Sequence, residues 1–270
     1  MEAASYHHYS GRSAEDYERH FVPAIGAPVS VEFLRTAALR PGERVLDVGC
    51  GTGIIARRAA TAVGTAGAVA AVDVADDMIA VARAQPAPTG APIRWRQGDA
   101  TSLPFADGSF DVVLCQMSLM FVEDRAAAIR EMHRVLSDQG RVVLSTPGSI
   151  QPTFEFMEQA IVDHISPSLA GFVQMVFSMH EPANLEALLR DGGFTDVEST
   201  VYTATFDLPS PAEFLWQYIN LTPMAPFIAE SPRASQDAME AQVVETWRPY
   251  VRDGRTPVDQ PMVLGTGARS

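Results

Sequence analysis

A glycine-rich turn follows a short apolar run in the first third of the chain. Asp47 lies near the end of that run, and Gly49, Gly51 and Gly53 follow it at alternate positions. Glycine has no Cβ atom, so such a turn brings bare backbone close to a ligand. Residues 54–60 are predicted to begin a helix. The free N–H groups at its N-terminus would point to the ligand that the turn approaches. The sequence therefore predicts a strand, a ligand-binding turn and a helix.

The spacing of these glycines differs from that of the dinucleotide-binding fingerprint, which has its third glycine three positions after the second. Counted from Gly49 and Gly51, that position is Ile54. Counted from Gly51 and Gly53, it is Ala56, which makes a weak match. A tight turn that binds no ligand is the alternative.

A second acidic residue, Asp73, ends the next apolar strand, 20 residues after Gly53. A carboxylate there can accept hydrogen bonds from both ribose hydroxyls of a nucleoside. Val74 and Met78 follow as apolar neighbours for a base. An N-cap role for Asp73 is the alternative, but Asp76 or Asp77 is closer to the following helix and suits that role better.

Two further segments lie at the ends of later strands. Residues 93–97 read as a strand that leads into Gly98, Asp99 and Ala100. A loop at 103–109 leads into a wholly apolar run that ends at Gln116, as a buried parallel strand requires. Together with the glycine turn and Asp73, these segments predict one ligand site at the carboxyl edge of a parallel sheet.

Residues 44–147, which hold these four motifs, resemble the class I S-adenosyl-L-methionine (SAM) dependent methyltransferases, and in particular the branch that includes the quinone-biosynthesis C-methyltransferases. The resemblance implies an α/β fold, a doubly wound seven-stranded sheet with six parallel strands, strand 7 antiparallel and helical lid insertions. It implies SAM as cofactor, with S-adenosyl-L-homocysteine as product, and a role for Asp99 in holding the adenine amino group. The cofactor-binding residues that we expect are Tyr17, Asp47, Gly49, Cys50, Gly51, Gly53, Asp73, Val74, Met78, Gly98, Asp99, Ala100, Gln116 and Met117.

The rest of the chain is expected to cover this core. The predicted units are an N-terminal cap (1–30), the SAM-binding core (31–147), a lid insertion (148–180), a core helix with strand 6 (181–206), a second lid insertion (207–258), and strand 7 with the tail (259–270). Long insertions are usually functional or serve as packing lids. These covers are rich in Phe, Met, Trp and Tyr, which suits an apolar pocket for the methyl acceptor. The alternative is that these side chains only bury the lid helices on the core.

Catalysis by alignment of nucleophile, methyl group and sulfur needs a base only where the nucleophile carries a proton. Histidine is suited to that role at neutral pH. We expect His180 first, because it precedes a core helix near the carboxyl edge, and then His20 and His8. The alternative for each is a surface or capping histidine.

The composition limits the partners. A net charge of −13, with Arg57 and Arg58 as the longest basic cluster, argues against a nucleic-acid substrate. Only Cys50 and Cys115 are present, and the first 20 residues are polar, which predicts reduced thiols and no signal peptide. We therefore expect a cytoplasmic protein with no membrane span and no metal site, and its oligomeric state stays open.

The function predicted from the sequence is methyl transfer from SAM to O or C of a small, largely apolar metabolite. A small-molecule N-methyltransferase is the second possibility, which an acidic residue facing the acceptor would favour. A non-catalytic SAM-binding sensor or scaffold is the third.

Overall fold

A seven-stranded sheet forms the centre of the protein, whose computed structural model describes residues 13–270. The strand order is β3-β2-β1-β4-β5-β7-β6, in which β7 runs antiparallel to both of its neighbours. The pairs among β1 to β5 are parallel. The predicted fold class is therefore confirmed. The strands are β1 (Arg44–Val48), β2 (Ala68–Asp73), β3 (Ile93–Gln97), β4 (Phe110–Gln116), β5 (Leu136–Pro147), β6 (Thr195–Leu208) and β7 (Thr256–Ala268).

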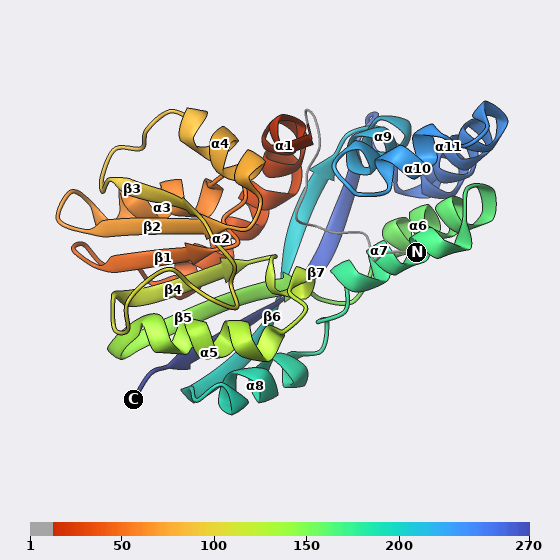
Figure 1. Cartoon of the computed structure of the whole chain (residues 1–270). Helices are drawn as coiled ribbons and strands as arrows, with labels where there is room; N and C mark the ends of the chain where they lie inside the picture. The colour runs from red at the N-terminus through yellow and green to blue at the C-terminus, as the bar shows by residue number, and fades with distance from the viewer. Residues whose placement is uncertain (1–12) are drawn as a thin grey trace.

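Helices cover both faces of this sheet (Figure 1). On one face, α2 (Ala27–Ala37), α3 (Ile54–Val63) and α4 (Asp76–Ala84) contribute apolar side chains to one core cluster. On the other, α5 (Arg125–Val135) and α8 (Pro182–Asp191) contribute to a second cluster. The parallel strands are consequently buried on both sides, which explains why their sequences are nearly continuous apolar runs.

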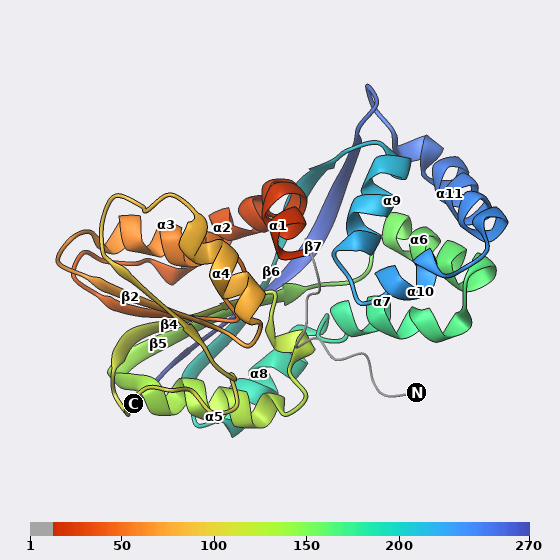
Figure 2. The same cartoon turned by 45° about the horizontal axis from the view of Figure 1, so that its top comes forward.

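A separate group of helices lies to one side of the sheet (Figures 1 and 2). We call it the lid. It consists of α6 (Pro152–His164), the 3-10 turn η3 (Pro167–Leu169), α7 (Ala170–Val176), α9 (Pro211–Asn220), α10 (Ala225–Ala229), α11 (Arg233–Trp247) and the 3-10 turn η4 (Arg248–Tyr250). Its apolar side chains form one cluster together with residues of α2, β6 and β7 such as Val29, Phe206 and Met262. At its centre Trp247 is fully buried and donates a hydrogen bond from Nε1 to the carbonyl oxygen of Thr153 (2.7 Å), which ties α11 to α6.

Strands β6 and β7 are longer than the sequence predicts. The unit with strand 6 was expected to end at residue 206 and the unit with strand 7 to begin at residue 259, but pairing between the two strands continues to Leu208 and Thr256. The pair extends beyond the sheet as an antiparallel ribbon and carries α9 to α11 at its tip (Figure 1). The second lid insertion accordingly comprises residues 209–255.

The N-terminal cap consists of α1 (Ser13–Asp16) and a π-helix, η1 (Tyr17–Gly26), which leads directly into α2. Pro23 lies inside η1, where it has no backbone N–H to donate. Figures 1 and 2 show this cap near α4 and the start of the β6–β7 ribbon. Among residues 13–270, every helix is too short or too polar to cross a membrane.

Candidate active site

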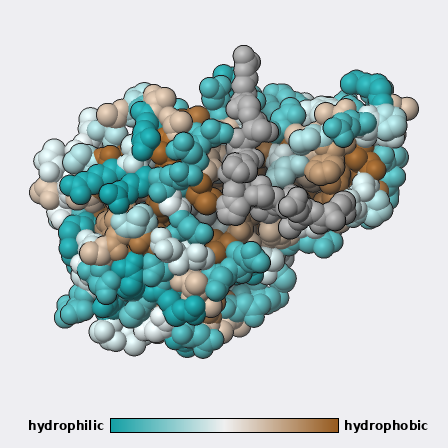
Figure 3. Space-filling model, viewed as in Figure 1, coloured by the Kyte–Doolittle hydropathy of each residue, from teal (hydrophilic) through white to brown (hydrophobic). Residues whose placement is uncertain are grey.

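A cavity of about 1150 Å³ lies between the carboxyl ends of β1 to β4, the N-terminal cap and the lid. On the face seen in Figure 3, brown apolar residues are visible both on the core and on the lid. Binding pockets for small molecules usually measure about 300–1,000 Å³. The cavity is therefore large enough for a nucleoside cofactor together with a second molecule.

The glycine turn after β1 forms one wall. Gly49, Gly51 and Gly53 all have positive φ values, of 66°, 51° and 90°. A Cβ atom at Gly49 would collide with the side chain of Ser118, and one at Gly53 would collide with the ring of Trp95. A Cβ atom at Gly51 would meet only Tyr17, at 3.6 Å. Gly51 is thus the glycine whose missing side chain leaves the cavity open.

Gly53 is one of the residues that we expected to bind the cofactor, yet it does not line the cavity. Its positive φ, and the collision that a Cβ atom there would make with the ring of Trp95, show that the turn itself requires glycine at this position. The other expected residues do line the cavity: Tyr17, Asp47, Gly49, Cys50, Gly51, Asp73, Val74, Met78, Gly98, Asp99, Ala100, Gln116 and Met117.

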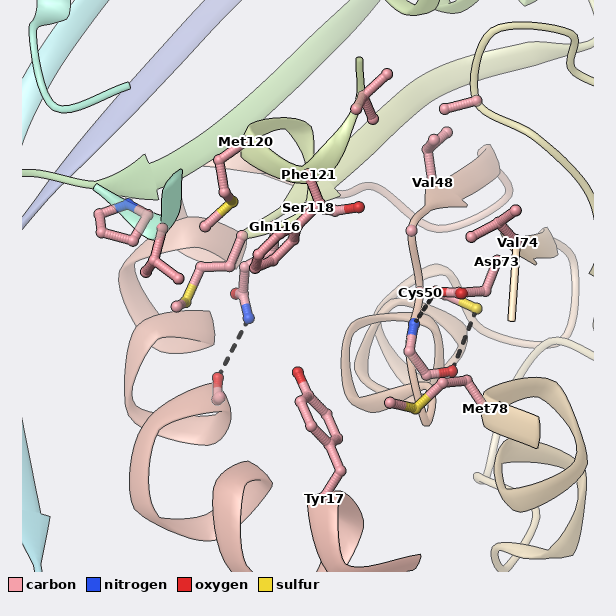
Figure 4. Close-up of a pocket in the computed structure, with 18 of the residues that line it drawn as sticks. Tyr17, Val48, Cys50, Asp73, Val74, Met78, Gln116, Ser118, Met120 and Phe121 are labelled. Carbon is pink, nitrogen blue, oxygen red and sulfur yellow. Dashed lines mark hydrogen bonds between the residues drawn. The ribbon is translucent and has the colours of Figure 1, made fainter. Parts of the chain in front are cut away.

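Asp73, at the end of β2, connects two parts of this wall (Figure 4). One carboxylate oxygen accepts a hydrogen bond from the backbone N–H of Gly51 (2.8 Å), and the other accepts one from Ala75 (2.9 Å). Burial raises the pKa of Asp73, and these backbone donors oppose that effect. Each oxygen has further lone pairs, so the group can still accept hydroxyl donors.

Asp47, at the base of the turn, is buried, with 1% of its surface exposed. Its Oδ2 atom has no hydrogen-bond partner in the described part of the chain. Burial raises the pKa of Asp47 to about 7, the N–H of Ala56 lowers it, and the neighbouring Asp73 raises it again. A buried carboxylate oxygen with no donor, beside a cavity, suits a ligand that brings positive charge or a donor.

Asp99 also lines the cavity and is exposed. Its Oδ1 accepts hydrogen bonds from the backbone N–H and the hydroxyl of Thr101, both at 2.8 Å. These bonds fix the carboxylate at the cavity rim. Gly98 allows close packing there, since a Cβ atom would lie 2.8 Å from Val72.

Gln116, Met117 and Tyr17 form the side of the cavity nearest the lid. Figure 4 shows the side chains of Tyr17 and Gln116 pointing into the space between η1 and the end of β4. The amide nitrogen of Gln116 donates to the carbonyl oxygen of Gly26 (3.3 Å), and its buried Oε1 has no hydrogen-bond partner among residues 13–270. Met117 has a φ of 50°, a backbone conformation that costs free energy for a non-glycine residue. Such outliers cluster at functional sites.

Further lining comes from the lid, from β6 and β7, and from the segment between β4 and α5, which includes Phe121 and leads to Arg125. Most of it is apolar: Phe121, Phe154, Phe172, Met175, Val176, Phe177, Phe206, Tyr218, Leu221 and Met262. The polar members at this end include Arg125, Thr222 and Gln260. We define this part of the cavity as the acceptor chamber. The sequence analysis did not predict these three polar residues, since they lie outside the motifs and have no distinctive spacing.

Histidine is absent from the cavity lining formed by residues 13–270. His180, our first candidate for a base, is exposed, and its ring nitrogens contact the carbonyl oxygen of Phe177 (2.9 Å) and the carboxylate of Glu181 (3.2 Å). His20 lies on η1 and does not line the cavity either. His8 lies outside the described residues. The structure thus brings neither His180 nor His20 to the acceptor chamber.

Comparisons with known proteins identify the class. Residues 46–144 match the model of a methyltransferase domain. The chain is 33% identical to the ubiquinone/menaquinone biosynthesis C-methyltransferase UbiE of Ectopseudomonas mendocina, over 61% of this chain and 70% of that protein. It is 28% identical to the nocamycin O-methyltransferase of Saccharothrix syringae, over 89% of this chain and 90% of that protein. A solved structure of the Haemonchus contortus phosphoethanolamine N-methyltransferase 2 with SAM shares the fold, with a TM-score of 0.58, 18% identity, and coverage of 95% of this chain and 56% of that one.

The fold and the site therefore define a methyltransferase. The chain belongs to the SAM-dependent methyltransferases and is an enzyme of the small-molecule type. The cavity fits SAM, because it offers an open position at Gly51, a carboxylate at the end of β2 and the unpartnered oxygen of Asp47. When bound, SAM supplies a methyl group on a positively charged sulfur. In the part of the chain that the structure describes, no cluster of His, Cys, Asp and Glu side chains is suited to a metal ion.

Proposed function

We propose that this enzyme transfers the methyl group of SAM to an oxygen or carbon atom of a small, largely apolar molecule bound in the acceptor chamber. The observation that carries this proposal is the lining of the chamber, where aromatic and Met side chains outnumber polar ones. Such a surface recognises an apolar molecule by burial and leaves orientation to a few polar groups. The protein's part in catalysis is then to align the acceptor with the methyl group and to exclude water.

For the cofactor, we propose the expected residues that line the cavity. Asp73 would accept the ribose hydroxyls, Asp99 the adenine amino group, and the backbone at Gly51 would lie against the cofactor. Tyr17, Gln116 and Met117 would face its methionine part. The support is that all of these residues line the same cavity, as Figure 4 shows for Tyr17, Asp73 and Gln116.

Oxygen is the atom that we favour. The similarity to the nocamycin O-methyltransferase extends over 89% of this chain, whereas that to UbiE covers 61%. A match of the greater length must include lid residues, and the lid supplies much of the acceptor chamber.

Transfer to nitrogen is the second candidate, because two carboxylates, Glu123 and Asp124, also line the cavity. An acidic group near the acceptor favours a cationic amine. Asp124 is already engaged, since it accepts a hydrogen bond from the N–H of Ala127 (2.8 Å) at the start of α5.

Mass spectrometry of a metabolite extract incubated with the enzyme tests these proposals. SAM with either an ordinary or a deuterated methyl group should give products that differ by the mass of the label, and the product's methyl chemical shift distinguishes O, C and N. The matched control is the Asp73→Ala variant, which should give no product. Binding of SAM without any labelled product across extracts would instead support a sensor or scaffold.

A further inference from the structure

Arg125 is an unusual side chain in the acceptor chamber. It is the first residue of α5, directly after the N-cap residue Asp124. A positive charge at a helix N-terminus is disfavoured by the helix dipole, by about 0.3–1 kcal/mol at exposed sites. Arg125 also lines the cavity among apolar side chains. Arginine at this position therefore destabilises α5 slightly, and the helix itself gives no reason for its presence.

The guanidinium of Arg125 is only partly satisfied by the protein. Its Nη2 donates to the carbonyl oxygen of Met120 (3.0 Å) and to the hydroxyl of Ser178 (2.9 Å). Its Nε is buried and has no hydrogen-bond partner among the described residues. Burial lowers the pKa of Arg125. A buried donor on a charged group is expensive to leave unpaired, so a ligand that supplies an acceptor there gains free energy.

No carboxylate of residues 13–270 forms an ion pair with Arg125. The nearest acidic residues in the sequence, Glu123 and Asp124, are both exposed, and Asp124 caps α5. Both partners that Arg125 has are neutral oxygens. The guanidinium of Arg125 therefore has no carboxylate bound to it in the described part of the chain, although Glu123 and Asp124 also line the cavity.

We propose that Arg125 binds an acidic oxygen group of the methyl acceptor, either a carboxylate or an ionised enol conjugated with a carbonyl group. This inference rests on the proposed function and specifies the acceptor. Both groups spread one negative charge over two oxygens, so one oxygen can accept a charge-assisted hydrogen bond from the guanidinium while the other stays available for methylation. Arg125 holds one oxygen, and the other is directed to the methyl group.

The charge balance of this reaction agrees with the residues in the chamber. A bond forms between the acceptor oxygen and the methyl carbon as the carbon–sulfur bond breaks, and that bond's electron pair stays on sulfur. The oxygen is already ionised, so no proton has to leave and no base is required. This agrees with a described cavity lining that includes no histidine. The methylated product is neutral and loses its charge interaction with Arg125, which favours its release.

Calorimetry with three probes of nearly equal size tests this assignment: cinnamate, cinnamamide and cinnamylamine, each titrated into the enzyme saturated with S-adenosylhomocysteine. We expect cinnamate to bind about ten-fold more tightly than cinnamamide, since hydrogen bonds to charged groups contribute that much or more. Arg125→Gln should abolish the preference, and Arg125→Lys should retain part of it. Arg130→Gln, on the exposed face of the same helix, is the matched control and should keep the full preference.

Equal affinity for cinnamate and cinnamamide in the wild type, or no binding of cinnamate, would overturn the assignment. Tighter binding of cinnamylamine would also overturn it and would favour an amine acceptor. A preference that survives in Arg125→Gln would assign the charge recognition to another residue. None of these results depends on turnover, so methyl transfer detected by the labelled-SAM experiment would still stand if Arg125 failed this test.

Discussion

Gly49, Gly51 and Gly53 adopt similar backbone conformations, but a Cβ atom would meet a different environment at each. At Gly49 and Gly53 it would collide with neighbouring side chains, so these positions require glycine for packing. At Gly51 it would enter the cavity opposite Tyr17. The regular spacing of these glycines therefore reflects two physical requirements. Gly49 and Gly53 are required by packing within the protein, and only Gly51 is required by the space for the ligand.

This difference leads to a prediction for two alanine variants. Gly51→Ala should remain folded with a modest loss of stability, because its Cβ has room, but its SAM affinity should fall about ten-fold or more. Gly49→Ala should lower the unfolding temperature by several degrees, because Ser118 has to move. Thermal unfolding and SAM calorimetry on both variants check this, and wild-type SAM affinity in Gly51→Ala would contradict it.

A second prediction concerns the buried carboxyl group of Asp47. Its pKa in the folded protein is raised to about 7 by burial, above the ordinary value of 3.8. The folded state therefore holds the proton more tightly than the unfolded state, and this contribution to stability is present below pH 4 and is lost as the pH rises through about 7. Each pH unit within that window costs at most about 1.4 kcal/mol.

Asp47→Asn removes this titration while keeping an oxygen that can accept from the N–H of Ala56. Without ligand, the stability of the wild type relative to Asp47→Asn should fall between about pH 4 and about pH 7 and then level off. Urea unfolding at several pH values measures this. A difference between the two proteins that stays constant with pH would show that Asp47 does not titrate in this range.

At the scale of elements, the N-terminal cap depends on an ion pair to the core. Arg57 of α3 donates from Nη2 to the carboxylate of Glu18 on η1 (2.8 Å), and from Nη1 to the carbonyl oxygen of Thr52 (2.5 Å). Both charged side chains are largely buried, with 15% and 19% exposed. The pair therefore joins η1, which presents Tyr17 to the cavity, to the glycine turn on the opposite wall.

We predict that Glu18→Ala weakens SAM binding, because it leaves Arg57 without its partner and releases the cap. Removing one member of a buried ion pair lowers the free energy of unfolding by about 3–5 kcal/mol. Because this pair is partly solvated, we expect a loss of about 1–3 kcal/mol of stability in Glu18→Ala. The matched control is Glu15→Ala, an exposed change in the cap. Equal SAM affinities of the two variants would remove this role from Glu18.

The elements also show which features a sequence can predict. The residues at the strand ends, such as Asp73 and Gln116, were predictable because a parallel strand places its last residue at the sheet edge. The extension of β7 was missed because Pro257 and Pro261 argue against a central strand. In the structure that stretch pairs with β6 alone, while pairing with β5 begins at Met262, so both prolines lie where the strand has a free edge.

The acceptor chamber was harder to predict than the cofactor wall. Its polar members Arg125, Thr222 and Gln260 come from separate parts of the chain and meet only after the lid packs on the core. His180 lies close in sequence to several lining residues. Its side chain is nevertheless exposed, whereas those of Phe177 and Met179 are buried. Sequence distance to a site gives no information about side-chain direction in an irregular segment.

At the scale of the whole molecule, the lid helices pack in a cluster with the ends of β6 and β7, apart from the two clusters that flank the rest of the sheet. Helices that pack in a different cluster can unfold locally while the rest of the sheet stays folded. We predict that S-adenosylhomocysteine alone protects the turns after β1 and β2 from amide hydrogen exchange. The lid helices α6, α7 and α9 should gain protection only when an acceptor analogue is also present. Lid amides that exchange as slowly as those of the sheet in the free enzyme would show a rigid lid.

The β6–β7 ribbon has a consequence for how such enzymes diversify. The insertion 209–255 leaves and returns through Leu208 and Thr256, which are directly paired across the ribbon. Its two ends are therefore held at a fixed, short separation by backbone hydrogen bonds that do not depend on what the insertion contains. Any segment whose own ends fit that separation can be exchanged at the ribbon tip as a cassette, while the catalytic sheet stays as it is. Recombination at this one junction would give the same methyl-transfer core a different choice of acceptor.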